Sequence, residues 1–158
     1  MKSLSKAHAI TIATPLAALA GAYAFQYLGG LAPCQMCWWQ RYAHAAALGL
    51  ALTPFIMGGQ KKLWVVLSAL ALAVAAAIGG FHAGVEYGWW KGLTECTSAV
   101  SFGAGSDPLA AIMAAPVVRC DVVQWSLLGI SMAGYDFLLS GAAAVAALVL
   151  GFRKEQVA

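Results

Sequence analysis

Four long apolar stretches in a chain of 158 residues limit its fold more than any other feature. A membrane-spanning α-helix needs about 20 mostly apolar residues, because each residue advances the helix by only about 1.5 Å. The stretches at about 10–28, 42–57, 63–87 and 130–152 meet or approach that length. Only 9% of the residues are charged, whereas a soluble domain carries roughly 25%. We therefore predict an all-α membrane protein with one four-transmembrane-helix domain over residues 1–158.

The first stretch, which follows Lys2 and Lys6, has to be distinguished from a secretory signal peptide. Its apolar run is longer than the core of a signal peptide, and no convincing cleavage site precedes the first cysteine. We expect it to be retained as the first helix.

The basic residues are distributed unevenly along this predicted bundle. Six of the nine fall on one side: Lys2, Lys6, Lys61, Lys62, Arg153 and Lys154. Since basic residues mark the cytoplasmic side, both termini are predicted to be cytoplasmic. The loops at about 29–41 and 88–129 then face the exported side and carry all four cysteines. The bases are scattered and the net charge is only +3, so nothing indicates a nucleic-acid partner.

The second of these loops holds Cys96 and Cys120, which are separated by 23 residues. Between them, Asp107-Pro108 is typical of a helix N-cap followed by proline at the first helical position. The apolar run from Leu109 to Val118 then predicts a short helix that lies on the bilayer surface. A buried turn against the bundle is the alternative.

The first loop ends in a C-x-x-C motif, Cys34-Gln-Met-Cys37, just before the second stretch. Two intervening residues permit a small disulfide ring that opens and closes with little backbone motion. Cys37 is expected near the first helical turn, where the helix dipole and free N–H groups favour a thiolate. The motif therefore predicts a redox-active pair. A structural disulfide or half of a metal site are the alternatives, although no second C-x-x-C is present for zinc.

Two polar residues lie at or near the start of the second predicted span. Arg41 is one helical turn beyond Cys37 and shares its face, so its guanidinium could favour the thiolate or donate a hydrogen bond to a carbonyl. The alternative is that it extends to lipid phosphates. His44 follows on the same stripe and is a candidate cofactor ligand, although a lone histidine is more often a satisfied interior residue.

Three further polar residues have no role that the sequence assigns. His82 and Glu86 are four residues apart at the exit of the third stretch, and they either pair with each other or line a polar pocket. Asp136 lies in the opening turns of the fourth stretch. An acid within a span is a functional candidate, but this one could instead reach the membrane interface.

Three segments of the chain resemble the disulfide bond formation protein B (DsbB) family. Pro33-Cys-Gln-Met-Cys-Trp-Trp-Gln-Arg41 resembles the family signature P-C-x-x-C-x-x-x-R. The segment from Cys120 to Ala133 resembles the family's second loop leading into its last helix, and His82-Ala-Gly-Val-Glu86 resembles its third-helix exit. Together with four spans and two cysteine pairs, the resemblance covers nearly the whole chain.

The resemblance implies a thiol:quinone oxidoreductase of the bacterial inner membrane with its cysteine loops in the periplasm. Such a protein reoxidises a periplasmic DsbA-like thiol oxidase and passes two electrons to ubiquinone or menaquinone. By motif position, Cys96 would form the mixed disulfide with the partner and Cys120 would complete that pair. Cys34 and Cys37 would form the pair nearer the quinone, with Cys37 in contact with the ring and Arg41 helping to bind it.

One feature departs from the family pattern. Many members have a histidine near the start of the second loop, where this chain has Trp89-Trp90-Lys91, and His82 lies deeper in the third stretch. No third-helix residue is therefore assigned to the quinone. A DsbI-type or vitamin K epoxide reductase-like oxidase with another partner is an alternative, as is a non-catalytic membrane protein with structural disulfides. The sequence leaves open the resting disulfide pairing and the oligomeric state.

Overall fold

The computed structural model describes residues 2–93 and 118–153. Within them lie four α-helices: α1 Lys2–Tyr27, α2 Gln35–Met57, α3 Lys61–Glu86 and α5 Met132–Phe152. Two strands of two residues each, β1 Ser126–Leu127 and β2 Ile130–Ser131, form a small antiparallel hairpin. The all-helical class that the sequence predicts is thus confirmed. Cys96 and the predicted short helix, apart from Val118 at its end, lie outside the described residues.

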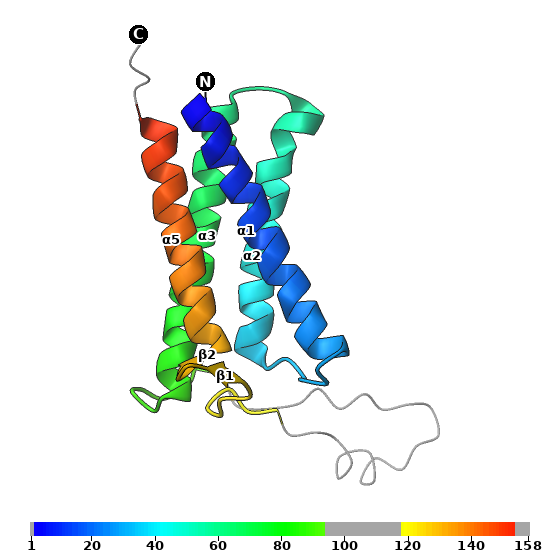
Figure 1. The fold of residues 1–158 in the computed structure, drawn as a ribbon, viewed down its shortest axis with the longest axis vertical. Helices are drawn as coiled ribbons and strands as arrows, with labels where there is room; N and C mark the ends of the chain where they lie inside the picture. The colour runs from blue at the N-terminus through cyan, green and yellow to red at the C-terminus, as the bar shows by residue number, and fades with distance from the viewer. Residues whose placement is uncertain (1, 94–117, 154–158) are drawn as a thin grey trace, which may run out of the picture.

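The four helices run alternately up and down the bundle (Figure 1). The principal contacts join α3 with α5, α2 with α3, α1 with α5 and α1 with α2. These contacts close a ring in which α2 and α5 lie on opposite corners. The start of α1, the end of α5 and the α2–α3 connection all lie at one end of the bundle, and the hairpin lies at the other (Figure 1).

Side-chain caps set the starts of two helices at the hairpin end. The Cys34 sulfur accepts a hydrogen bond from the backbone N–H of Cys37 at 3.3 Å and so caps α2. The Ser131 hydroxyl accepts from the N–H of Gly134 at 3.1 Å and caps α5. Because of this cap, the last helix begins at Met132, two residues after the position that the apolar pattern predicts.

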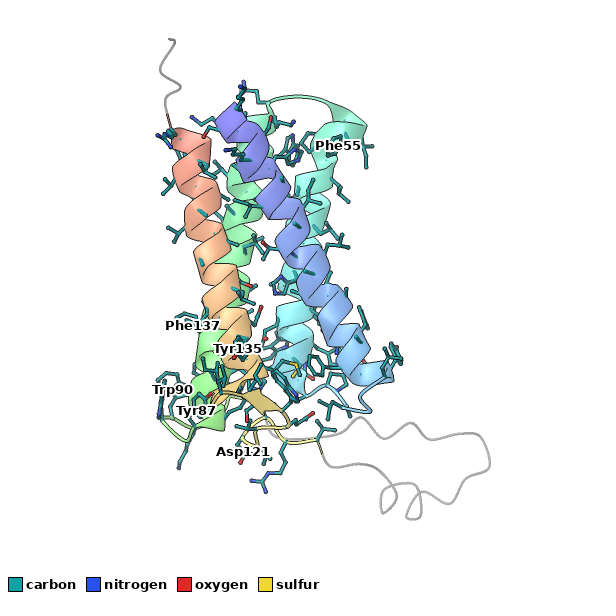
Figure 2. All side chains as sticks on the ribbon, in the orientation of Figure 1. Phe55, Tyr87, Trp90, Asp121, Tyr135 and Phe137 are labelled. Carbon is teal, nitrogen blue, oxygen red and sulfur yellow. The ribbon has the colours of Figure 1, made fainter. Side chains whose placement is uncertain are left out.

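Three of the described helices, α1, α3 and α5, are long and apolar enough to cross a membrane. The α2 helix has 23 residues but does not meet the same criterion. Its first half carries Gln40, Arg41 and His44, which are buried in the bundle instead of facing outward. Large apolar side chains project from the outer surface, among them Phe55 and Phe137 (Figure 2). This exterior suits contact with lipid chains.

Candidate redox site

The two cysteines of the C-x-x-C motif are in contact at the hairpin end of the bundle. Their sulfur atoms lie 3.0 Å apart, compared with about 2.05 Å in a disulfide, so they are two hydrogen-bonded thiols. Cys34 is buried, and Cys37 occupies the first turn of α2 as the sequence predicts. The hydrogen bond with Cys37, followed by burial, raises the pKa of the Cys34 thiol. Cys34 is therefore the member of the pair that holds a proton more firmly.

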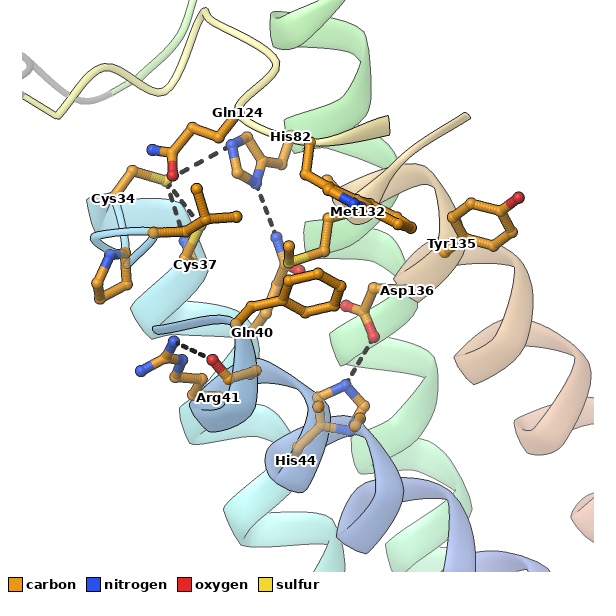
Figure 3. Close-up of a pocket in the computed structure, with 18 of the residues that line it drawn as sticks. Cys34, Cys37, Gln40, Arg41, His44, His82, Gln124, Met132, Tyr135 and Asp136 are labelled. Atoms are coloured by element: carbon orange, nitrogen blue, oxygen red, sulfur yellow. Dashed lines mark hydrogen bonds and ion pairs between the residues drawn. The ribbon is translucent and has the colours of Figure 1, made fainter. Parts of the chain in front are cut away.

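A third cysteine, from the second loop, approaches this pair. The Cys34 sulfur, the Cys120 sulfur and a ring nitrogen of His82 all lie within 4.8 Å of one another, and all three residues are buried. His82 Nε2 is 3.5 Å from the Cys34 sulfur, while Gln40 Nε2 lies 2.9 Å from His82 Nδ1 (Figure 3). The fold thus brings residues from α2, α3 and the second loop into one cluster.

Sulfur and imidazole donors of this kind are also zinc ligands. Two cysteines on a tetrahedral zinc ion with Zn–S bonds of about 2.3 Å have their sulfurs roughly 3.8 Å apart. Cys34 and Cys37 are closer, at 3.0 Å, and would have to separate to share one ion. The contact within the C-x-x-C pair therefore suits disulfide formation, and the described residues that could together hold a metal ion are Cys34, His82 and Cys120.

Glu86 lies beside this cluster. Its Oε1 atom is 3.8 Å from His82 Nε2, and both residues line the same cavity. His82 and Glu86 therefore lie next to each other and also line a pocket, so both predicted alternatives occur together. Among the described residues, no group hydrogen-bonds to the buried Oε2 atom of Glu86.

Arg41 is directed into the protein and contacts α1. Its Nη1 donates to Gln26 Oε1 at 2.5 Å and its Nη2 donates to the Ala22 carbonyl at 3.1 Å. The guanidinium also lies over the rings of Tyr23 and Trp38, 4.8 and 4.9 Å from their centroids. Only 7% of the residue is exposed, so the alternative in which it extends to lipid phosphates is wrong.

His44 and Asp136 form a polar pair that crosses the bundle from α2 to α5. His44 Nε2 lies 2.7 Å from Asp136 Oδ1, to which the Ser140 hydroxyl also donates at 2.9 Å (Figure 3). The Asp136 side chain is 14% exposed and faces the interior of the bundle, not its outer surface. Within the described ranges, His44 Nδ1 and Asp136 Oδ2 are buried without a hydrogen-bond partner.

These groups surround one cavity of about 250 Å³ between the helices. Its wall is mostly apolar, with many of the apolar residues coming from α1 and α5, and Phe25 and Trp125 contribute aromatic rings. Its polar lining residues include Cys34, Cys37, Arg41, His44 and Asp136. A cavity with mostly apolar walls and a few polar groups is typical of a site for a small organic molecule.

An ion pair lies next to Cys120 on the outer surface of the hairpin end. Arg119 donates two hydrogen bonds to Asp121, at 2.9 and 2.6 Å. These bonds lower the pKa of the Asp121 carboxyl, which is exposed. Being exposed, the pair contributes little to stability, but it keeps charge on the surface beside the buried cysteine.

Fold and site together define a helical membrane protein in which cysteines from two loops meet beside a cavity. The family model for the disulfide bond formation protein DsbB matches residues 5–150. The chain therefore belongs to the DsbB family, and the resemblance in its motifs is confirmed. Membership implies a disulfide oxidoreductase.

Individual relatives agree with this assignment. Disulfide bond formation protein B of Acidovorax sp. strain JS42 is 34% identical over 151 residues, which cover 90% of this chain and 84% of the relative. That of Aromatoleum aromaticum strain EbN1 is 32% identical over 139 residues, covering 82% and 81%. An uncharacterized protein of Rickettsia prowazekii, RP370, is 24% identical over 134 residues, covering 83% and 78%. No solved structure matches the chain.

Two residues of the cluster were not assigned to the site from the sequence. The sequence predicts for His82 only a pair with Glu86 or a place in a polar pocket, since 48 positions separate it from Cys34 and nothing local indicates that they meet. The sequence assigns no role to Gln40, because the predicted span begins at about residue 42 and leaves Gln40 in the preceding loop. The structure begins α2 at Gln35, which places this amide inside the helix, where it needs a partner.

Proposed function

We propose that this protein is a thiol:quinone oxidoreductase that reoxidises a periplasmic DsbA-like thiol oxidase and passes two electrons to ubiquinone or menaquinone. The observation that carries the proposal is the burial of Cys120 beside Cys34. Thiol–disulfide exchange requires one sulfur to attack another directly. Two loops whose cysteines lie within 4.8 Å need little motion for this transfer.

The electrons then move in two exchanges. After the partner has reduced the Cys96–Cys120 pair, the Cys120 thiolate attacks Cys34 of the oxidised first pair. A Cys34–Cys120 bond forms and Cys37 departs as a thiolate. The Cys96 thiolate next attacks Cys120, which restores the second disulfide and leaves the electron pair on Cys34. Two electrons and two protons have then moved from the second pair to the first.

The cavity next to the first pair fits a quinone. When bound, a quinone supplies a two-electron, two-proton acceptor for the dithiol. Cys37 lines this cavity, and Arg41 and His44 follow it on the same face of α2. Arg41 retains N–H groups beyond the two it donates to α1, since a guanidinium has five. The buried His44 Nδ1 has no partner in the described part of the chain. Because Nε2 donates to Asp136, Nδ1 can donate a second hydrogen bond to a carbonyl oxygen when the ring is in its imidazolium form.

The proposed setting is the bacterial inner membrane, with all four helices spanning it and the cysteine loops in the periplasm. The basic residues at the start of α3 and at both chain ends then face the cytoplasm. In this orientation the cysteines occupy the compartment in which disulfides persist. A quinone in the bilayer would reach the cavity laterally from among the lipid chains.

The purified protein, a soluble quinone analogue and a reduced DsbA-like protein provide the test. The wild type should oxidise the partner while it reduces the quinone, and Cys37→Ser should abolish both. Cys120→Ser is the informative comparison, because it should lose partner oxidation but still reduce quinone when a small dithiol reduces Cys34 and Cys37. Undiminished turnover by Cys37→Ser would rule the proposal out. Cysteine pairs that stay oxidised at every quinone redox state would instead support structural disulfides.

A further inference from the structure

His82 contacts the Cys34 sulfur and Gln40 contacts His82, although neither belongs to the predicted redox set. His82 comes from α3 and is 3% exposed, and its Nε2 lies 3.5 Å from the Cys34 sulfur. Gln40 comes from α2 and is 9% exposed, and its amide nitrogen lies 2.9 Å from His82 Nδ1. The three residues form a chain of buried contacts that ends on a reacting atom.

The amide contact fixes which ring nitrogen of His82 carries the proton. An amide nitrogen only donates hydrogen bonds, so Nδ1 of His82 must accept from Gln40. The neutral imidazole then has its proton on Nε2, the atom next to the Cys34 sulfur. A thiolate accepts such a hydrogen bond strongly, because bonds to an ionised acceptor are about twice as strong as neutral ones.

We propose that His82 is a catalytic residue that stabilises the thiolate released on Cys34, and that Gln40 is the positioning residue that fixes its tautomer. This inference rests on the exchange steps of the proposed function. When the Cys34–Cys120 disulfide is broken by attack at the Cys120 sulfur, the bonding electron pair remains on Cys34. His82 Nε2–H is then the donor that the new thiolate meets, and the thiolate afterwards takes up a proton to complete the dithiol.

Among the described residues, two acceptors compete with Cys34 for the His82 N–H: the backbone carbonyl of Cys120, with which His82 hydrogen-bonds, and the Glu86 carboxyl. Glu86 Oε1 is 3.8 Å from Nε2, beyond hydrogen-bonding distance for oxygen, whereas 3.5 Å to a sulfur atom is within range. The N–H therefore lies between the Cys34 sulfur and the Cys120 carbonyl, and a thiolate on Cys34 is the stronger acceptor of the two. The titratable or charged groups that surround this contact are Glu86 on α3, Cys37 and Arg41 on α2, Asp136 on α5, and Cys120 in the second loop.

The first test measures the thiolate on Cys34 alone. In a full-length chain carrying Cys37→Ser, Cys96→Ser and Cys120→Ser, the rate of iodoacetamide alkylation is followed against pH in detergent. Adding His82→Leu should move the midpoint of this profile upward by about one pH unit and slow alkylation about tenfold at neutral pH. Gln40→Leu should move it in the same direction by less, because the ring then loses its fixed tautomer but keeps its N–H.

His8→Leu is the matched control. His8 is also a buried histidine, 3% exposed, but it contacts the Ala51 carbonyl at the opposite end of the bundle. It should leave the alkylation midpoint unchanged. An unchanged midpoint in a folded His82→Leu protein would overturn the proposal, and so would an equal shift from His8→Leu. If His82→Leu does not fold, the alkylation profile of Gln40→Leu is used instead. An unchanged midpoint in that variant would overturn the proposal.

A second test separates this role from the quinone reaction. In the otherwise wild-type chain freed of quinone, a reduced partner is mixed with the oxidised protein for a single turnover. His82→Leu should slow the appearance of the Cys34–Cys37 dithiol about tenfold while the first mixed disulfide forms at an unchanged rate. If the Cys34–Cys37 dithiol appears at the wild-type rate in His82→Leu, the proposed role of His82 is refuted, whatever the rate of quinone turnover. A protein that never reduces quinone, but shows both effects, would refute only the proposed function.

Discussion

Arg41 combines a charge with a fixed geometry. Its guanidinium donates to two acceptors on α1 and lies over two aromatic rings, a set of contacts that a planar fork can make at once. A lysine at this position would keep the charge but lose at least one of these hydrogen bonds. The residue therefore holds α1 against α2 next to the cavity and also places its remaining N–H groups there.

We predict that Arg41→Lys weakens quinone binding without affecting Cys34. A hydrogen bond to a charged group contributes about 1.5 kcal/mol or more, so the KM for a quinone analogue should rise about tenfold. Steady-state kinetics over a range of analogue concentrations would measure it. The alkylation profile of Cys34 should stay unchanged, and a KM equal to that of the wild type would show that Arg41 serves only to pack α1.

Variants of His44 and Asp136 measure how much an unpaired polar group inside the bundle lowers the free energy of unfolding. We expect His44→Leu to lower the free energy of unfolding by about 3 kcal/mol, because Asp136 keeps its buried carboxyl without the imidazole. The double variant with Asp136→Leu should be less destabilised than the sum of the single variants, since both polar groups are then gone. Unfolding in mixed micelles would provide the three values. Strict additivity would mean that the two residues are not coupled.

The contact of α3 with α5 depends on a glycine. A Cβ atom on Gly79 would lie 3.0 Å from the backbone nitrogen of Phe137 and from Asp136 Oδ2, so it would collide with the main chain of α5. Gly49, in the middle of α2, has no atom within 4 Å of the corresponding position. The two glycines therefore share a helical setting and differ in what surrounds them.

We predict that Gly79→Ala destabilises the bundle by about 1–3 kcal/mol, because α3 and α5 must move apart. Gly49→Ala should be neutral or stabilising by up to about 1 kcal/mol, since alanine favours the helix. Thermal unfolding of the two variants in the same detergent would compare them. Equal stability of both would show that the helices can adjust around a methyl group.

The helices themselves could largely be predicted from the sequence, because apolar runs and caps are local features. The C-x-x-C motif and its place at a helix start are local in the same way. The partners of His82 and Asp136 could not be predicted, since each contact joins helices that are far apart in the chain. The polarity of α2 is explained by the same contacts, because its Gln40 and His44 face partners on α3 and α5.

At the scale of the whole molecule, the two ends of the bundle are chemically different. One end has the basic residues at the starts of α1 and α3, with Lys62 lying over the Phe152 ring at 4.5 Å. The other end has Cys34, Cys37 and Cys120 and several of the tryptophans. Because α2 connects the two ends, they can lie on opposite sides of a membrane only if this more polar helix also spans it.

This arrangement makes a prediction about accessibility in cells. In a cysteine-free chain, single cysteines are placed at the exposed positions Leu93, at the thiol end, and Gln60, before α3. A membrane-impermeant maleimide applied to intact spheroplasts should label Leu93→Cys at once and Gln60→Cys only after permeabilisation. Labelling of both in intact spheroplasts would mean that α2 does not cross the bilayer. Labelling of Gln60→Cys alone would indicate the opposite orientation in the membrane. The cysteines would then face the reducing cytoplasm, where a disulfide relay could not be sustained.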